Sequence, residues 1–154
     1  MLKLVVIAVV VGISFASPAK SRVDEENCPF NDEGFNGQCY YFNANSMNFE
    51  DANTACKALN HEFVTILGQK VQNFINYHAY GLQSWIGIRL VNGDWQWNSN
   101  GEIVKPTFTN WENQKVPTDP AKACAIIDGS KNGVWRAVSC TDMNWSICQM
   151  AAPQ

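Results

Sequence analysis

The sequence is poor in charged residues and has no run of basic ones. Only 16% of the residues are Asp, Glu, Lys or Arg, and the formal net charge is -3 with a pI near 5.3. Proteins that bind nucleic acids concentrate Lys and Arg on one face, so we do not expect binding to nucleic acid. The low charge does not indicate disorder, because 46% of the residues are apolar and 12% are aromatic.

The sequence also lacks the motifs of common catalytic sites. There is no Gly-x-Ser-x-Gly elbow, no phosphate-binding glycine loop and no Cys/His nucleophile pair. His61 and His78 lack the spacing of zinc ligands, which favours a helix-end or core role for both. We therefore do not expect an enzyme.

The one long apolar run lies at the N-terminus. Lys3 precedes an apolar stretch at 4–13, and small residues then stand at the positions that a signal peptidase reads, with cleavage after Ala16. A membrane-spanning helix needs about 20 apolar residues, more than this run has. We expect a signal peptide at 1–16, a flexible arm at 17–27, no membrane span, and a secreted, extracellular protein.

Six cysteines follow the expected cleavage site: Cys28, Cys39, Cys56, Cys124, Cys140 and Cys148. An even number of cysteines in an exported protein implies three disulfides. No pair has the CxxC spacing of a zinc ribbon or a redox site. The spacing alone does not choose among the possible pairings.

Apolar periodicity predicts two helices in the first half of the chain. Phe49, Ala52 and Cys56 recur at helical spacing with Leu59, after a good N-cap residue in Asn48. A second helix is expected over 69–80, with Gly81 able to end it. Strands are expected over 39–42, 64–66, 85–88, 94–97, 123–127, 134–138 and 145–148.

The strands of the second half surround a long irregular segment. Asn92-Gly93 predicts a tight hairpin turn. Residues 98–122 then show little periodicity and contain Gly101, Pro106, Pro117 and Pro120. A connection of this length inside a compact domain is usually functional. The length of the chain allows one domain, and the order of elements predicts an α+β fold.

This arrangement resembles the C-type lectin-like domain in its long, secreted, single-domain form. The matching pieces are Cys28-x10-Cys39, Trp85-Ile86-Gly87-Ile88, Trp95-Gln96-Trp97, Phe108-Thr109-Asn110-Trp111 and the spacing of Cys124, Cys140 and Cys148 around Trp135. They extend over 28–149, which we take as the domain, with a tail at 150–154. The resemblance implies two helices, short antiparallel sheets and ligand binding by the long loop. It also implies the disulfides Cys28–Cys39, Cys56–Cys148 and Cys124–Cys140.

Sugar-binding members of this family hold a calcium ion in the long loop through oxygen ligands. These ligands come from a Glu/Gln-Pro-Asn/Asp triplet, an acidic residue just before the fourth cysteine, and a Trp-Asn-Asp triplet. At the matching positions this chain has Val116-Pro117-Thr118, Lys122 or Ala123, and Trp135-Arg136-Ala137. Calcium needs six to eight oxygen ligands, and most of the family's ligands are replaced here, two of them by basic residues. We expect no cofactor and no calcium at the family's sugar site. Glu112, Asn113, Gln114 and Asp119 could ligate an ion placed elsewhere, but solvated loop residues are the better interpretation.

If the resemblance holds, several side chains of the loop lie near one another. The candidate ligand-binding residues are Asn113, Gln114, Lys115, Thr118, Asp119, Lys122 and Arg136. Their basic and hydrogen-bonding groups suit an anionic group on a glycan or a protein. Ordinary surface charge is the simpler interpretation of the same residues.

Two further features depend on burial. The resemblance places Trp85, Trp95, Trp111 and Trp135 at structural positions, which favours core packing over sugar stacking. Asn144 begins an Asn-Trp-Ser sequon and is a glycosylation candidate in an exported protein.

Three hypotheses for function follow. The first is a secreted lectin-like protein of innate immunity that binds glycans or glycoproteins through its long loop without the usual calcium site. The second is a protein-binding module of the same fold, for defence, inhibition or adhesion. The third is a matrix-associated or mineral-associated protein. The sequence does not determine the oligomeric state.

Overall fold

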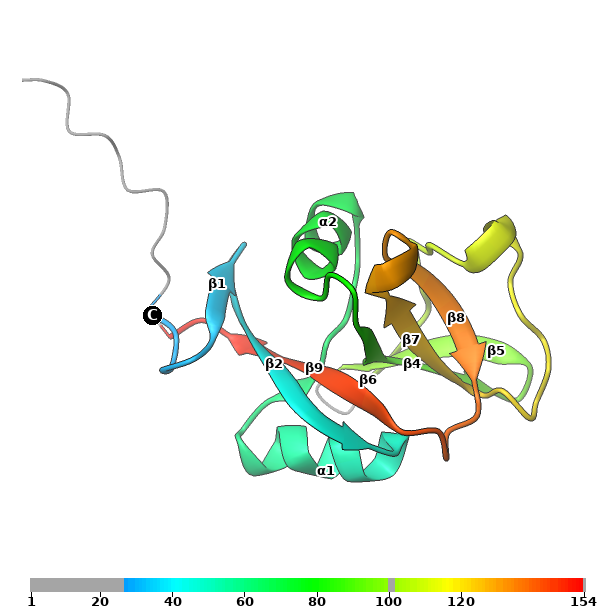
Figure 1. Ribbon diagram of the computed structural model, residues 1–154, viewed down its shortest axis with the longest axis horizontal. Coiled ribbons are helices and arrows are strands. Elements are labelled where there is room, and N and C mark those ends of the chain that lie inside the picture. The colour runs from blue at the N-terminus through cyan, green and yellow to red at the C-terminus, as the bar shows by residue number, and fades with distance from the viewer. Residues whose placement is uncertain (1–26, 100–101, 154) are drawn as a thin grey trace, which may run out of the picture.

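The computed structural model describes residues 27–99 and 102–153 (Figure 1). The expected signal peptide at 1–16 and the arm at 17–27, apart from Asn27, lie outside the described residues. Across the described residues, no helix has the length and the apolar character needed to cross a membrane.

The described residues form two α-helices, two short 3-10 helices and nine strands. The helices are α1 (Phe49–Ala58), α2 (Gln69–His78), η1 (Glu112–Gln114) and η2 (Gly129–Lys131). The strands are β1 (Glu33–Phe35), β2 (Gln38–Met47), β3 (Glu62–Phe63), β4 (Gln83–Val91), β5 (Asp94–Ser99), β6 (Glu102–Val104), β7 (Cys124–Asp128), β8 (Val134–Val138) and β9 (Asn144–Ala151). The predicted α+β fold is confirmed.

The strands belong to one mixed sheet with the order β1-β2-β9-β4-β5-β6. Strand β3 pairs with β9, and β7 joins β4 to β8. Strands β4 and β9 run parallel, and the other pairs are antiparallel. The long ribbon of β2 and β9 brings the two ends of the domain together, and Figure 1 shows α1 and α2 on opposite sides of it.

Helix α1 forms for the reason that the sequence indicates. The Asn48 side chain accepts a hydrogen bond from the Asp51 backbone N–H at 3.0 Å, which satisfies a free donor of the first turn. Phe49, Ala52 and Cys56 are buried on one face of the helix. Leu59 lies beyond the helix and is 46% exposed, so its predicted place on the buried face is wrong.

The predicted strand at 64–66 is also misplaced, because β3 ends at Phe63. Residues 64–66 are buried without a regular ladder: the Val64 N–H donates to the Ile147 carbonyl, and the Val64 carbonyl accepts from Gly87. This part of the chain lies close to β4, since a Cβ at Gly87 would be 2.9 Å from the Phe63 Cβ. Residues 64–66 are therefore a buried segment that does not form a strand.

The second half of the fold agrees with most of the predicted strands. Asn92 and Gly93 have φ values of 53° and 87° between β4 and β5, as a type I′ turn requires. Strand β6 lies inside the segment predicted to be irregular, so the long loop begins after Val104. Strand β9 ends at Ala151, two residues beyond the expected end of the domain.

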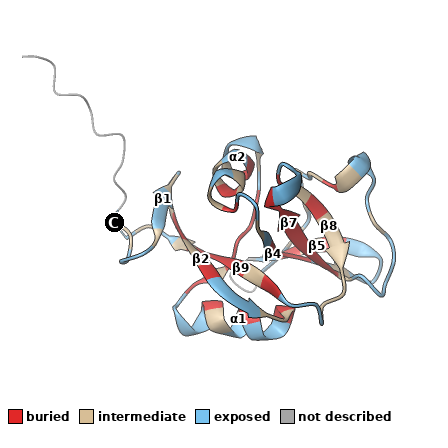
Figure 2. Ribbon diagram, in the orientation of Figure 1, coloured by how far each residue is buried: buried red, intermediate tan, exposed pale blue. Residues whose placement is uncertain are grey.

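The core is rich in tryptophan and is braced by three disulfides. Trp85 and Trp135 have no exposed surface, and Trp95 and Trp111 are at most 5% exposed, so the core role predicted for these four residues is confirmed. Trp97, for which no role was predicted, also has no exposed surface. Figure 2 shows the buried residues gathered along the central strands. The disulfides are Cys28–Cys39, Cys56–Cys148 and Cys124–Cys140, as the resemblance implies. On the chain-entropy model, the second stabilises the fold by about 4–5 kcal/mol, because it closes a loop of 92 residues.

Candidate functional site

A hollow of about 380 Å³ lies where the long loop passes over strand β8, and we call it the loop hollow. Its lining residues are Glu112, Pro117, Thr118, Asp119, Lys122, Trp135, Arg136 and Ala137. The loop supplies the first five of these, and β8 supplies the other three. The disulfide Cys124–Cys140 lies at the base, where the loop enters β7.

Tryptophan side chains and backbone bonds hold the loop in place. The Trp95 indole N–H donates to the Pro117 carbonyl at 2.8 Å, and the Trp135 backbone N–H donates to the Asn110 carbonyl at 2.7 Å. The Trp111 ring contacts Trp95 and Trp135, with centroid distances of 4.6 and 5.6 Å. These tryptophans therefore hold the loop from the core side, and do not offer open faces to a ligand.

Four charged side chains form a network beside the loop hollow. The Arg136 guanidinium contacts the Asp128 carboxylate at 2.8 Å and the Glu112 carboxylate at 3.7 Å. The Lys131 ammonium contacts Glu112 at 2.9 Å. The network joins η1 of the long loop to β8 and to the turn between β7 and β8. Its two positive and two negative charges balance.

Asp128 is the buried member of this network. Its side chain has no exposed surface, and its carboxylate accepts hydrogen bonds from the Ser130 hydroxyl at 2.6 Å and from Gln83 at 3.2 Å. Burial acts to raise the pKa of Asp128. The hydrogen bonds from Ser130 and the Arg136 guanidinium outweigh burial, and the pKa is lowered from its ordinary value.

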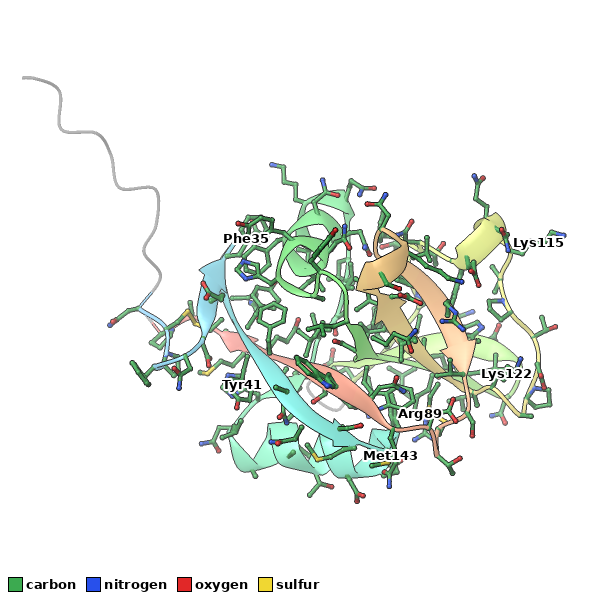
Figure 3. All side chains as sticks on the ribbon, in the orientation of Figure 1. Phe35, Tyr41, Arg89, Lys115, Lys122 and Met143 are labelled. Atoms are coloured by element: carbon green, nitrogen blue, oxygen red, sulfur yellow. A yellow bond between two sulfur atoms is a disulfide. The ribbon has the colours of Figure 1, made fainter. Side chains whose placement is uncertain are left out.

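The fold brings together some of the candidate ligand residues and separates others. Thr118, Asp119, Lys122 and Arg136 line the loop hollow. Asn113 and Gln114 lie on η1, Lys115 follows them, and none of the three lines the hollow. Figure 3 shows Lys115 beside η1 and Lys122 near the other end of the loop. The expected group of Lys115, Lys122 and Arg136 is therefore divided.

Sequence reasoning gave no role in the site to Asp128 or Lys131, and treated Glu112 only as an oxygen donor. These residues come from three elements. Asp128 is 8 positions away in the sequence from its partner Arg136, and Lys131 is 19 positions away from its partner Glu112. The one available signal is the position of Glu112, which directly follows the motif at 108–111 inside the long irregular segment. The pairing itself depends on the β7–β8 register, in which Ile126 lies opposite Arg136.

The residues at the family's sugar site do not fit a calcium ion. The carboxylates of Glu112 and Asp128 are both engaged by Arg136 or Lys131. Lys122 adds a further positive charge to the hollow. Asp119 faces its own turn, where its carboxylate accepts from the Ala121 N–H at 2.9 Å. A divalent ion would meet positive charge at the positions where the family has oxygen ligands.

The glycosylation candidate lies in the sheet. Asn144 is the first residue of β9 and pairs with Met47 of β2. It is 8% exposed, and Ser146 of the same sequon is 1% exposed. In the folded domain the sequon is therefore poorly accessible.

Comparison with known proteins agrees with this fold. The family described as Lectin C-type domain matches residues 45–150. The CD209 antigen of Symphalangus syndactylus is 30% identical over 130 residues, which are 81% of this chain. The chain spans 33% of the length of that relative.

Solved structures give the same result. The mouse scavenger receptor C-type lectin carbohydrate-recognition domain is 28% identical, with a TM-score of 0.72 over 82% of this chain and 98% of that one. A calcium-independent type II antifreeze protein is 23% identical, with a TM-score of 0.72 over 82% and 95% of the two chains. The antifreeze protein shares the fold, which is therefore not confined to sugar recognition.

Proposed function

The chain belongs to the C-type lectin domain family, and on this premise we propose that it is a secreted, non-catalytic recognition protein that binds glycans through its long loop without calcium. The observation that carries the proposal is the charge network beside the loop hollow. Arg136 and Lys131 neutralise Glu112 and Asp128 from within the chain, so the loop is held without an added cation.

The loop hollow offers groups that suit a glycan. The Thr118 hydroxyl, the Asp119 carboxylate and the Lys122 ammonium supply donors and acceptors beside Arg136. The positive charge of Arg136 is offset by Asp128 and Glu112, whereas Lys122 makes no ion pair within the described part of the chain. Lys122 is therefore our candidate contact for a sulfate or carboxylate group on the glycan.

A glycan array that includes sulfated and sialylated glycans tests this function. We expect binding that EDTA leaves unchanged and that falls about tenfold in Lys122→Glu, since one charge-assisted hydrogen bond is lost. Lys70→Glu is the matched control, because Lys70 is exposed on α2 and does not line the hollow. Loss of binding in EDTA would contradict the calcium argument, and an equal loss in both variants would contradict the role of Lys122.

A protein-binding module is the second candidate function. Val116 of the long loop and Met143, just before β9, are each 60% exposed. Apolar side chains at the surface are the groups that a protein partner covers. An array without glycan binding would favour this function.

Secretion has its own test. We propose that the mature chain begins after Ala16 and that its lectin-like domain extends from Cys28 to the end of β9. Intact-mass measurement of the protein from culture medium should give the chain without residues 1–16. Retention of this segment in the secreted protein would contradict the signal peptide.

A further inference from the structure

A second and larger cleft is lined by residues of α1, α2, β2, β3, β4, β5 and β9, and of the loops next to them. Its volume is about 850 Å³, and it shares no lining residue with the loop hollow. Figure 1 shows α1 on the opposite side of the β2–β9 ribbon from α2. Tyr40, Phe49 and Phe63 line the cleft and are at most 4% exposed, so they give it an apolar floor.

Side-chain carboxamides are unusually frequent in the walls of this cleft. Five of them have no hydrogen-bond partner within the described residues: Asn36, Gln38, Asn53, Asn60 and Asn98. They come from separate segments of the chain and meet only in the fold. A sixth, Gln149, is held in place: its oxygen accepts from the Thr65 N–H at 2.9 Å, and its amide donates to Glu62 at 3.3 Å.

The charges around the cleft do not favour an ion of either sign. Arg89 is paired with Glu50 at 2.7 Å and lies over the Phe49 ring. Lys57 and Glu62, which carry opposite charges, both line the cleft. His61 is paired with Asp32, which is outside the cleft, at 2.8 Å. The groups left to bind a ligand are therefore mainly neutral carboxamides.

We infer that this cleft is a second binding site, for a neutral, hydroxyl-rich ligand such as an oligosaccharide. Each carboxamide offers two N–H donors and one acceptor oxygen, and each sugar hydroxyl both donates and accepts. The volume lies within the range of about 300–1,000 Å³ that is common for ligand sites. The inference does not depend on the proposed role of the long loop.

Titration of the ¹⁵N-labelled, disulfide-bonded protein with maltotriose, chitotriose and mannotriose tests this site by NMR. We expect at least one of the three to give saturable shifts of the Asn53 and Asn98 side-chain amide signals. The double variant Asn53→Ala/Asn98→Ala should weaken that binding about tenfold or more, because two hydrogen-bonding groups are removed. Both residues lie outside the hydrophobic core, so the variant should keep the fold, which its own spectrum reports.

Two controls make the test specific. Asn73→Ala removes an exposed carboxamide of α2 that is not in the cleft, and binding should be unchanged. Lys122→Glu alters the loop hollow and should also leave these shifts unchanged, which separates this site from the proposed function. The inference is overturned by an absence of saturable shifts at about 10 mM sugar. The inference is also overturned if the double variant binds the sugar with the same affinity as the native protein. It is likewise overturned if none of the sugars shifts these signals and an uncharged capped tripeptide, titrated in the same way, does.

Discussion

The Arg136 guanidinium lies 2.8 Å from the buried carboxylate of Asp128 and connects β8 to the end of β7. The same guanidinium reaches Glu112 of the long loop at 3.7 Å. In the family resemblance, Arg136 stands where an asparagine would contribute a calcium ligand. The positive charge beside the loop is therefore part of the chain itself.

Replacement of Arg136 by methionine should destabilise the fold, because it leaves the buried Asp128 carboxylate without its cation. We expect a loss of about 1–3 kcal/mol, less than for a fully buried pair, because Arg136 is 31% exposed. Urea unfolding measures it. Arg89→Met breaks an exposed pair with Glu50 and should cost less than about 1 kcal/mol. Equal losses in the two variants would contradict the importance of the Arg136–Asp128 pair.

The stabilisation supplied by Asp128 should depend on pH. Its pKa is lowered in the folded protein, so its contribution is present above the unfolded value near 4 and is lost as the pH falls through the folded value. Asp128→Asn should therefore be less stable than the native protein at neutral pH, and the difference should shrink at about pH 3. Urea unfolding across this range measures the difference. Asp94→Asn, at an exposed strand position, should show no such trend.

His61 should anchor the segment before β1 to the end of α1. Its two ring nitrogens lie 2.8 Å from the Leu59 carbonyl oxygen and 2.8 Å from the Asp32 carboxylate, and both paired side chains are 4% exposed. His61→Phe leaves Asp32 buried without a partner and should cost about 1–3 kcal/mol in the free energy of unfolding. His78→Phe is the control, since His78 contacts the Phe42 and Phe74 rings. A larger loss in the control would contradict the anchoring role of His61.

Asn144 should be unmodified in the secreted protein. The side chain is 8% exposed at the start of β9, and the sequon serine is 1% exposed, so the folded domain hides both. Peptide mapping by mass spectrometry should recover the unglycosylated peptide. A glycosylated Asn144 would show that modification precedes the pairing of β9 with β2.

Local signals in the sequence predicted the elements that depend on local physics. Asn48 caps α1 because its side chain reaches the Asp51 N–H three residues later. Asn92 and Gly93 form the hairpin turn because both adopt positive φ. Residues 64–66 were predicted as a strand, and that prediction was wrong, because the buried segment makes single backbone hydrogen bonds to Ile147 and Gly87 and no ladder.

The sequence by itself determined the cysteine count, the tryptophan-rich composition and the presence of basic residues at positions 122 and 136. The family resemblance added the disulfide pairing, which the structure confirms. Only the tertiary structure decided that Arg136 is neutralised by Asp128 and Glu112, that Lys115 lies apart from the loop hollow, and that six carboxamides line one cleft. The physical reason is the sequence separation of the interacting residues. A helix cap or a turn depends on residues that are neighbours along the chain. A charge pair or a cleft depends instead on the register and packing of strands that are far apart in the sequence.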